Sequence, residues 1–147
     1  MTRHSRSGFS LIELMVAVAI MAILSSIAYP LYESQSRKGK RADGIVLLEK
    51  VAQLEQQYFS HMGTFTSTVK DLTGIKSETS PGGYYKVSVV VDANSFVATA
   101  EPITTDQKKD LCEFTLSNLG VRGVTVKDAG GKSVPADDAM RIRCLGK

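Results

Sequence analysis

Hydrophobic and polar positions divide the chain into an apolar N-terminal stretch and a mixed remainder. Residues 1–8 are polar and basic, and residues 9–32 contain a single charged side chain, Glu13. A helix rises about 1.5 Å per residue, so roughly 20 apolar residues span the hydrocarbon core of a bilayer. The pattern therefore predicts a membrane helix over residues 9–32, because so short a chain could not bury a core helix of this kind.

The rest of the chain shows the spacing of one helix followed by a sheet. An apolar stripe with helical spacing predicts an amphipathic helix that ends near Gly63. Its members are Leu47, Val51, Leu54 and Tyr58. Alternating apolar and polar positions then predict strands at residues 85–91, 96–100, 112–116 and about 123–126. The predicted fold is α+β, with a long N-terminal helix packed on an antiparallel sheet of about four strands.

Other segments carry weaker structural signals. Residues 61–83 are rich in Gly, Ser and Thr and are expected to form a surface loop. Residues 129–146 show only weak strand signals. In the third strand the alternation places Glu113 on the polar face. Gly39 and Gly44 each weaken a helix by up to ~1 kcal/mol relative to Ala, so we expect some bend between them.

Glu13 distinguishes three interpretations of the apolar stretch. The stretch could be a secretory signal peptide cleaved after Ala28, a plain signal anchor, or the N-terminus of a prepilin. A carboxylate deep in an apolar helix costs about 2.5–3.5 kcal/mol, and the first two classes have no use for it. If the chain were cut between Gly8 and Phe9, the new amine of a neighbouring chain would be a suitable partner for Glu13.

The residues around Glu13 read Gly8-Phe9-Ser10-Leu11-Ile12-Glu13, and the apolar run after them contains Pro30. This segment resembles the N-terminus of type IV pilins and type II secretion pseudopilins. The resemblance implies that a prepilin peptidase cuts after Gly8 and N-methylates Phe9, and that Glu13 pairs with the N-terminus of an adjacent subunit during assembly. Pro30 would kink the helix because its ring removes an amide and clashes with the preceding turn.

The same resemblance implies a division of the chain and a location. Residues 1–8 would be a leader peptide, residues 9–32 the membrane and filament-core helix, and residues 33–147 a periplasmic headgroup. The chain would cross the bacterial inner membrane once and later join a cell-surface pilus. Its expected partners are other pilin subunits, the prepilin peptidase, the inner-membrane assembly platform and, before assembly, membrane lipid.

The basic residues of segment 37–41 conflict with this orientation. They outnumber the basic leader residues, and simple counting would place their side of the membrane in the cytoplasm. The cysteine pair and the cleavage motif both require an external headgroup, and we give them more weight. We expect the cluster to be a solvated or subunit-facing patch, with lipid headgroups as a contact before assembly.

The two cysteines, Cys112 and Cys144, fit an exported pilin headgroup. A bond between them would stabilise the fold by about 3–4 kcal/mol in the chain-entropy model. The alternative is a pair of reduced core thiols in a cytosolic protein. In pilins the loop bounded by such a disulfide carries partner contacts, which would assign residues 113–143 to that role.

Residues 111–123 resemble the corresponding segment of PilE-type minor pilins, with a Thr-Leu strand after the first cysteine and a Gly-x-Arg-Gly turn. This resemblance implies a low-abundance structural subunit that supports pilus assembly, and thereby twitching motility, adhesion or DNA uptake. Two alternatives remain open. One is a type II secretion pseudopilin, and the other is a DNA-receptor minor pilin of the ComP type.

Composition and charge limit the classes of function that the chain could have. The chain has 147 residues, a net charge of +3 and two histidines, and it lacks the Gly-x-Ser-x-Gly, His-Glu-x-x-His and phosphate-loop motifs. We therefore expect neither enzymatic activity, nor a cofactor, nor a metal site, and interpret Asp137-Asp138 as a solvated turn. Acidic residues interrupt the C-terminal basic residues, so nucleic-acid binding is the less favoured alternative. These basic residues are Lys108, Lys109, Arg122, Lys127, Lys132, Arg141, Arg143 and Lys147.

Overall fold

The computed structural model describes residues 9–103, 112–127 and 132–145. The chain forms two compact units, Met1–Ser36 and Arg37–Lys147. Helix α1 (Leu11–Met62) begins in the first unit and ends in the second. We call the second unit the headgroup.

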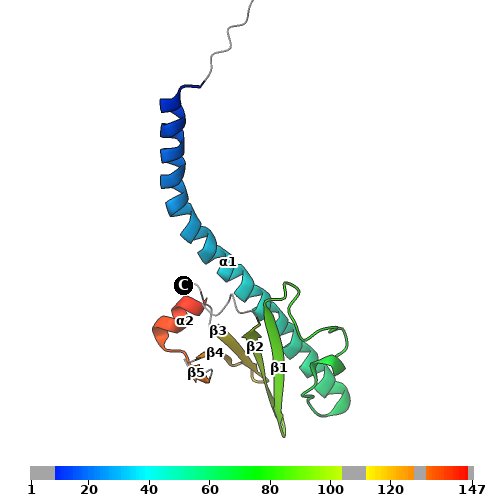
Figure 1. Ribbon diagram of the computed structural model, residues 1–147. Helices are drawn as coiled ribbons and strands as arrows, with labels where there is room; N and C mark the ends of the chain where they lie inside the picture. Colours follow the sequence, from blue (N-terminus) through cyan, green and yellow to red (C-terminus); the bar gives the residue numbers. More distant parts are fainter. Residues whose placement is uncertain (1–8, 104–111, 128–131, 146–147) are drawn as a thin grey trace, which may run out of the picture. The chain divides into compact units, whose positions relative to one another are not determined.

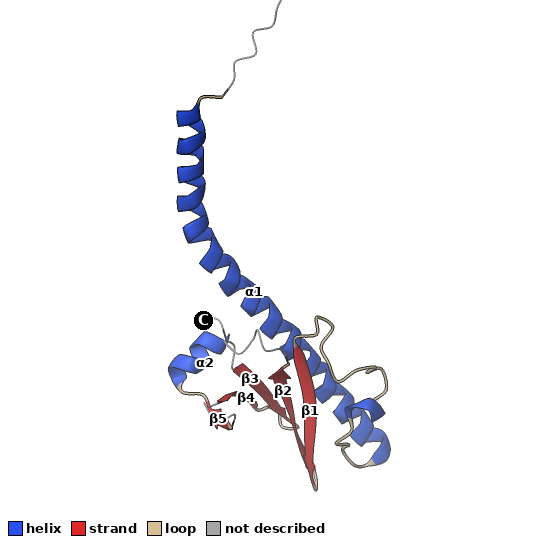
Figure 2. Ribbon diagram, in the orientation of Figure 1, coloured by secondary structure: helices blue, strands red, loops and turns tan. Residues whose placement is uncertain are grey.

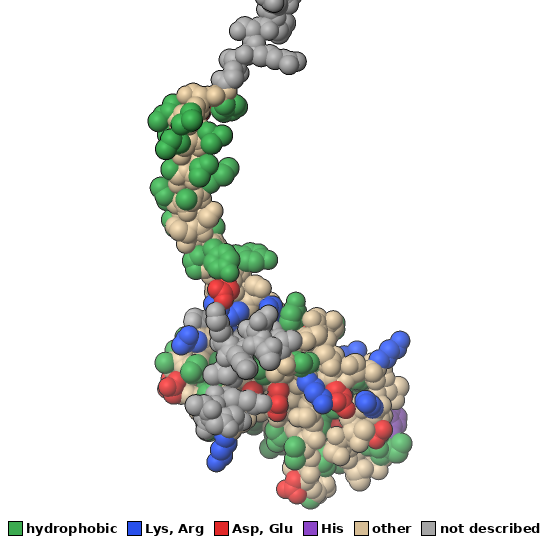
Figure 3. Space-filling model, viewed as in Figure 1, with side chains coloured by type: hydrophobic (Ala, Val, Ile, Leu, Met, Phe, Trp, Pro, Cys, Tyr) green, Lys and Arg blue, Asp and Glu red, His purple; other side chains and the backbone are tan. Residues whose placement is uncertain are grey.

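The described part of the first unit is an apolar helix without a core of its own. Every side chain from residue 9 to residue 32 is exposed. Hydrophobic side chains dominate its visible surface (Figure 3). Its most apolar 18-residue window has a mean hydropathy of 2.4, and none of that window is buried. Pro30 lies within the helix. A helix that is apolar on all sides requires lipid or other protein around it.

The headgroup is built around a five-stranded antiparallel sheet in the order β1-β2-β3-β4-β5 (Figures 1 and 2). The strands are β1 (Tyr85–Asp92), β2 (Ser95–Pro102), β3 (Cys112–Ser117), β4 (Arg122–Lys127) and β5 (Ser133–Pro135). The first four confirm the predicted strands. The fifth is a three-residue addition within the segment that showed only weak strand signals.

The second half of α1 packs its apolar stripe against the sheet. Val51 is completely buried, as is Tyr85 of β1. Gly44 allows the close approach, because a Cβ at this position would lie 2.5 Å from Cγ of Tyr85. The sequence analysis treated Gly44 as a source of bending. In the structure Gly44 also makes room for the tyrosine ring, and the bend stays a prediction.

The chain leaves α1 at the predicted place. Gly63 has a φ of 73°, and its amide donates to the carbonyl of Phe59 at 2.8 Å. The loop that follows contains one short 3₁₀ helix, η1 (Val69–Asp71), whose Val69 is buried. Phe65 stacks on Phe59 at 4.5 Å between ring centroids and meets Phe96 edge-on at 5.0 Å. The loop is therefore anchored to the core by its few apolar residues.

The C-terminal segment contains a helix, α2 (Asp138–Leu145), that the sequence analysis missed. The carboxylate of Asp137 accepts the amide of Met140 at 2.7 Å, which is the geometry of an N-cap. Both side chains are exposed, as the interpretation of Asp137-Asp138 as solvated expects, but the pair lies at the start of a helix and not in a turn. The carboxylate of Asp137 satisfies one of the first amides of α2, which have no partner inside the helix.

Glu113 is the second departure from the predicted pattern. Its position alternates with apolar residues of β3, yet only 1% of its surface is exposed. Its carboxylate accepts hydrogen bonds from the hydroxyl of Thr125 at 3.0 Å and from that of Ser133. Since β4 and β5 supply these hydroxyls, the carboxylate is buried on the face that alternation assigned to solvent.

Candidate functional site

The first candidate site is the start of α1. Phe9 is 83% exposed, and Glu13 lies in the first turn of the helix, where a negative charge is favoured by the helix dipole. No ion pair or hydrogen bond reaches Glu13 from the described residues. Gly8 lies outside them. Cleavage after Gly8, methylation of Phe9 and pairing of Glu13 therefore stay predictions, as does the kink at Pro30.

The second candidate site is the end of α2, which is fixed in two ways. A disulfide joins Cys112 of β3 to Cys144 of α2, with the Cα atoms 5.8 Å apart, and both residues are buried. Arg41 of α1 donates from Nη1 to the carbonyl of Cys144 at 3.1 Å and also to that of Arg143. These are terminal carbonyls of a helix, where a cation is favourable.

Segment 37–41 is thus more than a solvated patch. Besides Arg41, Lys40 lies over the ring of Tyr84 at 5.0 Å from its centroid. The contact of Arg41 with α2 also places this basic segment beside Arg141 and Arg143, whose side chains are exposed. Two basic clusters far apart in the sequence therefore adjoin at one end of the headgroup.

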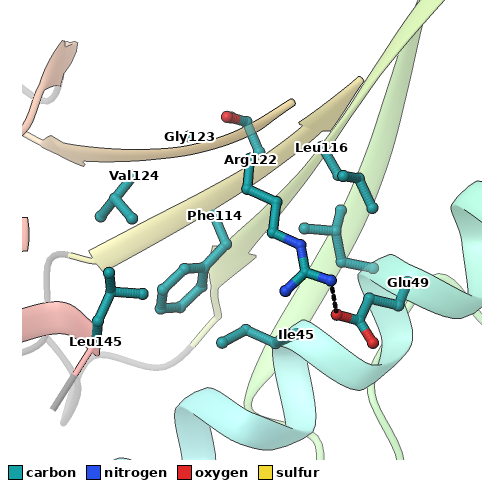
Figure 4. Close-up of a pocket in the computed structure, with 10 residues that line it drawn as sticks. Ile45, Glu49, Phe114, Leu116, Arg122, Gly123, Val124 and Leu145 are labelled. Atoms are coloured by element: carbon teal, nitrogen blue, oxygen red, sulfur yellow. Dashed lines mark ion pairs between the residues drawn. The ribbon is translucent and has the colours of Figure 1, made fainter. Parts of the chain in front are cut away.

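An apolar hollow of about 80 Å³ lies between α1, β3, β4 and the end of α2 (Figure 4). Phe114, Val124 and Leu145 point into it, and Ile45 closes it from the helix (Figure 4). Arg122 reaches from β4 across its edge to Glu49 of α1, with nitrogen and oxygen 2.9 Å apart. Both side chains are substantially exposed, so we expect this ion pair to contribute little to stability.

The two glycines of the Gly-x-Arg-Gly turn are needed for different structural reasons. Gly120 has a φ of 75°, which favours glycine in the turn between β3 and β4. At Gly123 a Cβ would lie 2.3 Å from the hydroxyl oxygen of Thr115 on the facing strand. Together they allow β4 to return closely along β3 and hold Arg122 opposite α1.

Glu55 is a buried carboxyl that the sequence analysis did not single out. It is completely buried, and its Oε2 accepts the amide of Thr66 at 3.1 Å. Burial raises the pKa of the Glu55 carboxyl above its ordinary value, and the hydrogen bond from Thr66 opposes that rise. The available signal was position, because Glu55 follows Leu47 and Val51 at steps of four residues along the buried stripe.

The predicted basic face is only partly within the described structure. Lys108, Lys109, Lys147 and the side chain of Lys127 lie outside it, and Arg122 is paired with Glu49. In the part of the chain that is described, no group of three or more His, Cys, Asp or Glu side chains could hold a metal ion.

Comparison with protein families gives two matches. A model described as the prokaryotic N-terminal methylation motif matches residues 3–29. A second, described as type IV minor pilin ComP, DNA uptake sequence receptor, matches residues 30–116. The two matches follow one another along the chain.

Curated relatives are fimbrial proteins. A fimbrial protein of Neisseria meningitidis serogroup A is 32% identical over 64% of this chain and 55% of its own length. The major pilin PilE1 of Neisseria gonorrhoeae is 31% identical, over 91% of this chain and 62% of its own length. EcpC of Eikenella corrodens is 30% identical, over 82% and 78%. The chain thus spans a little over half the length of the first two relatives.

A solved structure has the same fold. The non-core minor pilin PilV of Neisseria meningitidis matches with a TM-score of 0.52 and 24% identity, over 71% of this chain and 99% of that one. The likeness supports the helix-on-sheet architecture. The relative named PilE1 is described as a major pilin. The second family and the solved PilV structure are both described as minor pilins.

Proposed function

The chain belongs to the type IV pilin family, and from this premise we propose that it is a minor structural subunit of a type IV pilus. The observation that carries the proposal is the match of the minor pilin ComP family to residues 30–116, which include the amphipathic part of α1 and most of the sheet. In this role the chain is a structural component and not an enzyme. Its incorporation supports pilus assembly, and through the pilus twitching motility, adhesion or DNA uptake.

Assembly in this proposal depends on the first residues of the mature chain. The prepilin peptidase removes residues 1–8 and methylates Phe9, and Glu13 then pairs with the amine of a neighbouring subunit. Pairing offsets the cost of about 2.5–3.5 kcal/mol for an isolated carboxylate in an apolar environment. The inner-membrane platform transfers the apolar helix from lipid into the filament, and the headgroup passes from the periplasm to the cell surface.

Substitution of Glu13 tests this role. We expect Glu13→Gln to reduce the amount of the chain in sheared pili at least tenfold while its level in the membrane stays unchanged. Glu33→Gln, which changes a carboxyl on the same helix near the end of the apolar stretch, is the matched control and leaves incorporation unchanged. Quantitative mass spectrometry of pili and membranes measures both. Equal incorporation of the Glu13→Gln chain would contradict the proposal.

A second candidate function is DNA binding, which the description of the matching family and one structural observation favour. The contact of Arg41 with the end of α2 brings basic segment 37–41 beside Arg141 and Arg143. The side chain of Glu113 is buried, so it does not contact a ligand at this surface. The resulting basic end would bind phosphates without reading the base sequence.

Salt dependence tests DNA binding by the full chain in detergent. Duplex DNA should bind at low salt, with an affinity that falls steeply as salt rises. Replacing Arg141 and Arg143 by Glu should weaken binding and reduce the slope of log K against log salt by about 2. The matched control replaces Lys70 and Lys76, exposed in the loop after α1. No binding at low salt, or equal losses in both double variants, would exclude this candidate.

A further inference from the structure

Strand β1 lies at one border of the sheet, and only half of its outer edge is covered (Figure 2). Residues 78–80 run antiparallel along the first half. The amide of Ser80 donates to the carbonyl of Tyr85 at 2.8 Å, and the amide of Val87 donates to that of Glu78 at 2.7 Å. The remaining half of the edge, residues 88–92, has no such neighbour among the described residues.

The register of the hairpin determines which backbone groups face the open side. Asp92 pairs with Ser95 across a two-residue turn, so the even-numbered residues of β1 exchange hydrogen bonds with β2. The amides and carbonyls of Val89 and Val91 point away from β2. Within the described part of the chain, none of these four groups has a hydrogen-bond partner.

This half of the edge also lacks the usual protection against pairing. Natural edge strands are commonly blocked by Lys, Pro or a bulge. Residues 88–92 contain neither Lys nor Pro, and the β1–β2 register is continuous. Val90 is 68% exposed and lies opposite Val97, which is 43% exposed. An added strand would therefore satisfy backbone groups and place a side chain against the exposed Val90 at the same time.

We propose that this edge pairs with the same edge of a second copy of the chain, antiparallel about Val90. The segment is complementary to itself in that register. Val89 lies opposite Val91 of the second copy, and the two such pairs form four backbone hydrogen bonds. Val90 lies opposite its own counterpart. Each Asp92 lies opposite Ser88, which keeps the two carboxylates apart.

The symmetry of this contact separates it from filament assembly. A two-fold contact uses the same surface on both copies and is closed, whereas a helical filament grows through contacts between different surfaces. The pairing therefore links two copies that are not successive subunits of one filament. It does not depend on the proposed role in the pilus.

Cysteine cross-linking of the full chain in membranes tests the pairing. Val90→Cys places two thiols at a pair in which Cβ atoms are about 4.5–5.5 Å apart. On mild oxidation we expect at least tenfold more disulfide-linked homodimer than with Lys76→Cys, an exposed position on the loop after α1. Mass analysis checks that the Cys112–Cys144 bond is retained.

Charge at position 88 gives the sharper test in the Val90→Cys background. Ser88→Lys places a cation opposite Asp92 of the second copy and should raise the homodimer yield about threefold. Ser88→Asp places like charges opposite each other and should lower the yield by a similar factor. Equal or absent effects of Lys and Asp would overturn the register. Cross-linking to a different protein instead of a second copy would overturn the choice of partner.

Discussion

The two halves of α1 are parts of one helix, yet their apolar side chains differ in burial. In the first half Leu11 is 77% exposed and Ile23 63% exposed, and no side chain from residue 9 to residue 32 is buried. In the second half Leu48 is only 3% exposed and Val51 is completely buried, because the headgroup sheet covers them.

The difference shows which apolar surface the chain buries by itself and which surface needs lipid or other protein around it. The second half has its apolar stripe on one face and meets a sheet from the same chain. The first half is apolar all round, and its described side chains up to residue 32 are all exposed. Substitutions in the second half should therefore change headgroup stability, whereas those in the first half should change membrane insertion and filament assembly.

The largest expected effect on this comparison comes from loss of the disulfide. Replacing both Cys112 and Cys144 by Ser should lower the free energy of unfolding of the headgroup by about 3–4 kcal/mol. Thermal denaturation followed by near-ultraviolet circular dichroism measures the change, and reductant added to the unaltered chain is the control. Helicity of the apolar half should not change. An unaltered melting temperature would show that the bond does not hold the headgroup together.

Gly44 and Gly39 form a matched pair that sharpens the comparison within α1. Gly44→Ala should lower headgroup stability by about 1–3 kcal/mol, because the added methyl clashes with the buried ring of Tyr85. Gly39→Ala meets no atom within 4 Å and should raise stability by up to about 1 kcal/mol through helix propensity. Chemical denaturation distinguishes the opposite signs. Two variants with the same sign would contradict the packing described for this part of α1.

A smaller effect is expected at Arg41, which caps the end of α2. Arg41→Met retains most of the aliphatic stem but loses the hydrogen bonds to terminal carbonyls, so stability should fall by about 1 kcal/mol. Lys38→Met, in the same basic segment, is the control and should have no measurable effect. Faster hydrogen exchange at the end of α2 should accompany the loss at Arg41. Equal responses of the two variants would argue against the cap.

Glu55 should give the smallest effect, visible only as pH dependence. Because burial raises its pKa, the folded state favours the protonated form, and stability falls as pH rises through that raised pKa. Glu55→Gln keeps an acceptor for the amide of Thr66 without the charge. In denaturation experiments, the free energy of unfolding of Glu55→Gln should fall less between pH 4 and pH 7 than that of the unaltered chain. Parallel pH profiles would rule out a contribution from this carboxyl.

Periodicity predicted the large elements because their signals are local. The stripe through Leu47 and Val51 and the alternation in β1 both follow from side chains that face one core. The end of α1 followed from Gly63, which adopts a positive φ just beyond the helix. The motif with Phe9 and Glu13 is also local in the sequence, so its resemblance to a pilin N-terminus could be found without a structure.

The missed features depend on contacts between distant segments. Glu113 is buried because β4 and β5 return with hydroxyl groups, which alternation within β3 does not show. Gly44 is tied to Tyr85, and Arg41 to the carbonyl of Cys144. Two missed features had a local signal. Glu55 lies in the helical stripe after Val51. Helix α2 has the capping carboxylate of Asp137, but its short length concealed the helical period.

The most direct measurement is the N-terminus and intact mass of the chain extracted from membranes, with and without reductant. The account predicts a chain that begins at N-methylated Phe9 and gains the mass of two hydrogens on reduction. A chain that begins at Tyr29 would contradict it, because residues 1–28 would then be a cleaved signal peptide and Glu13 would have no place in a filament.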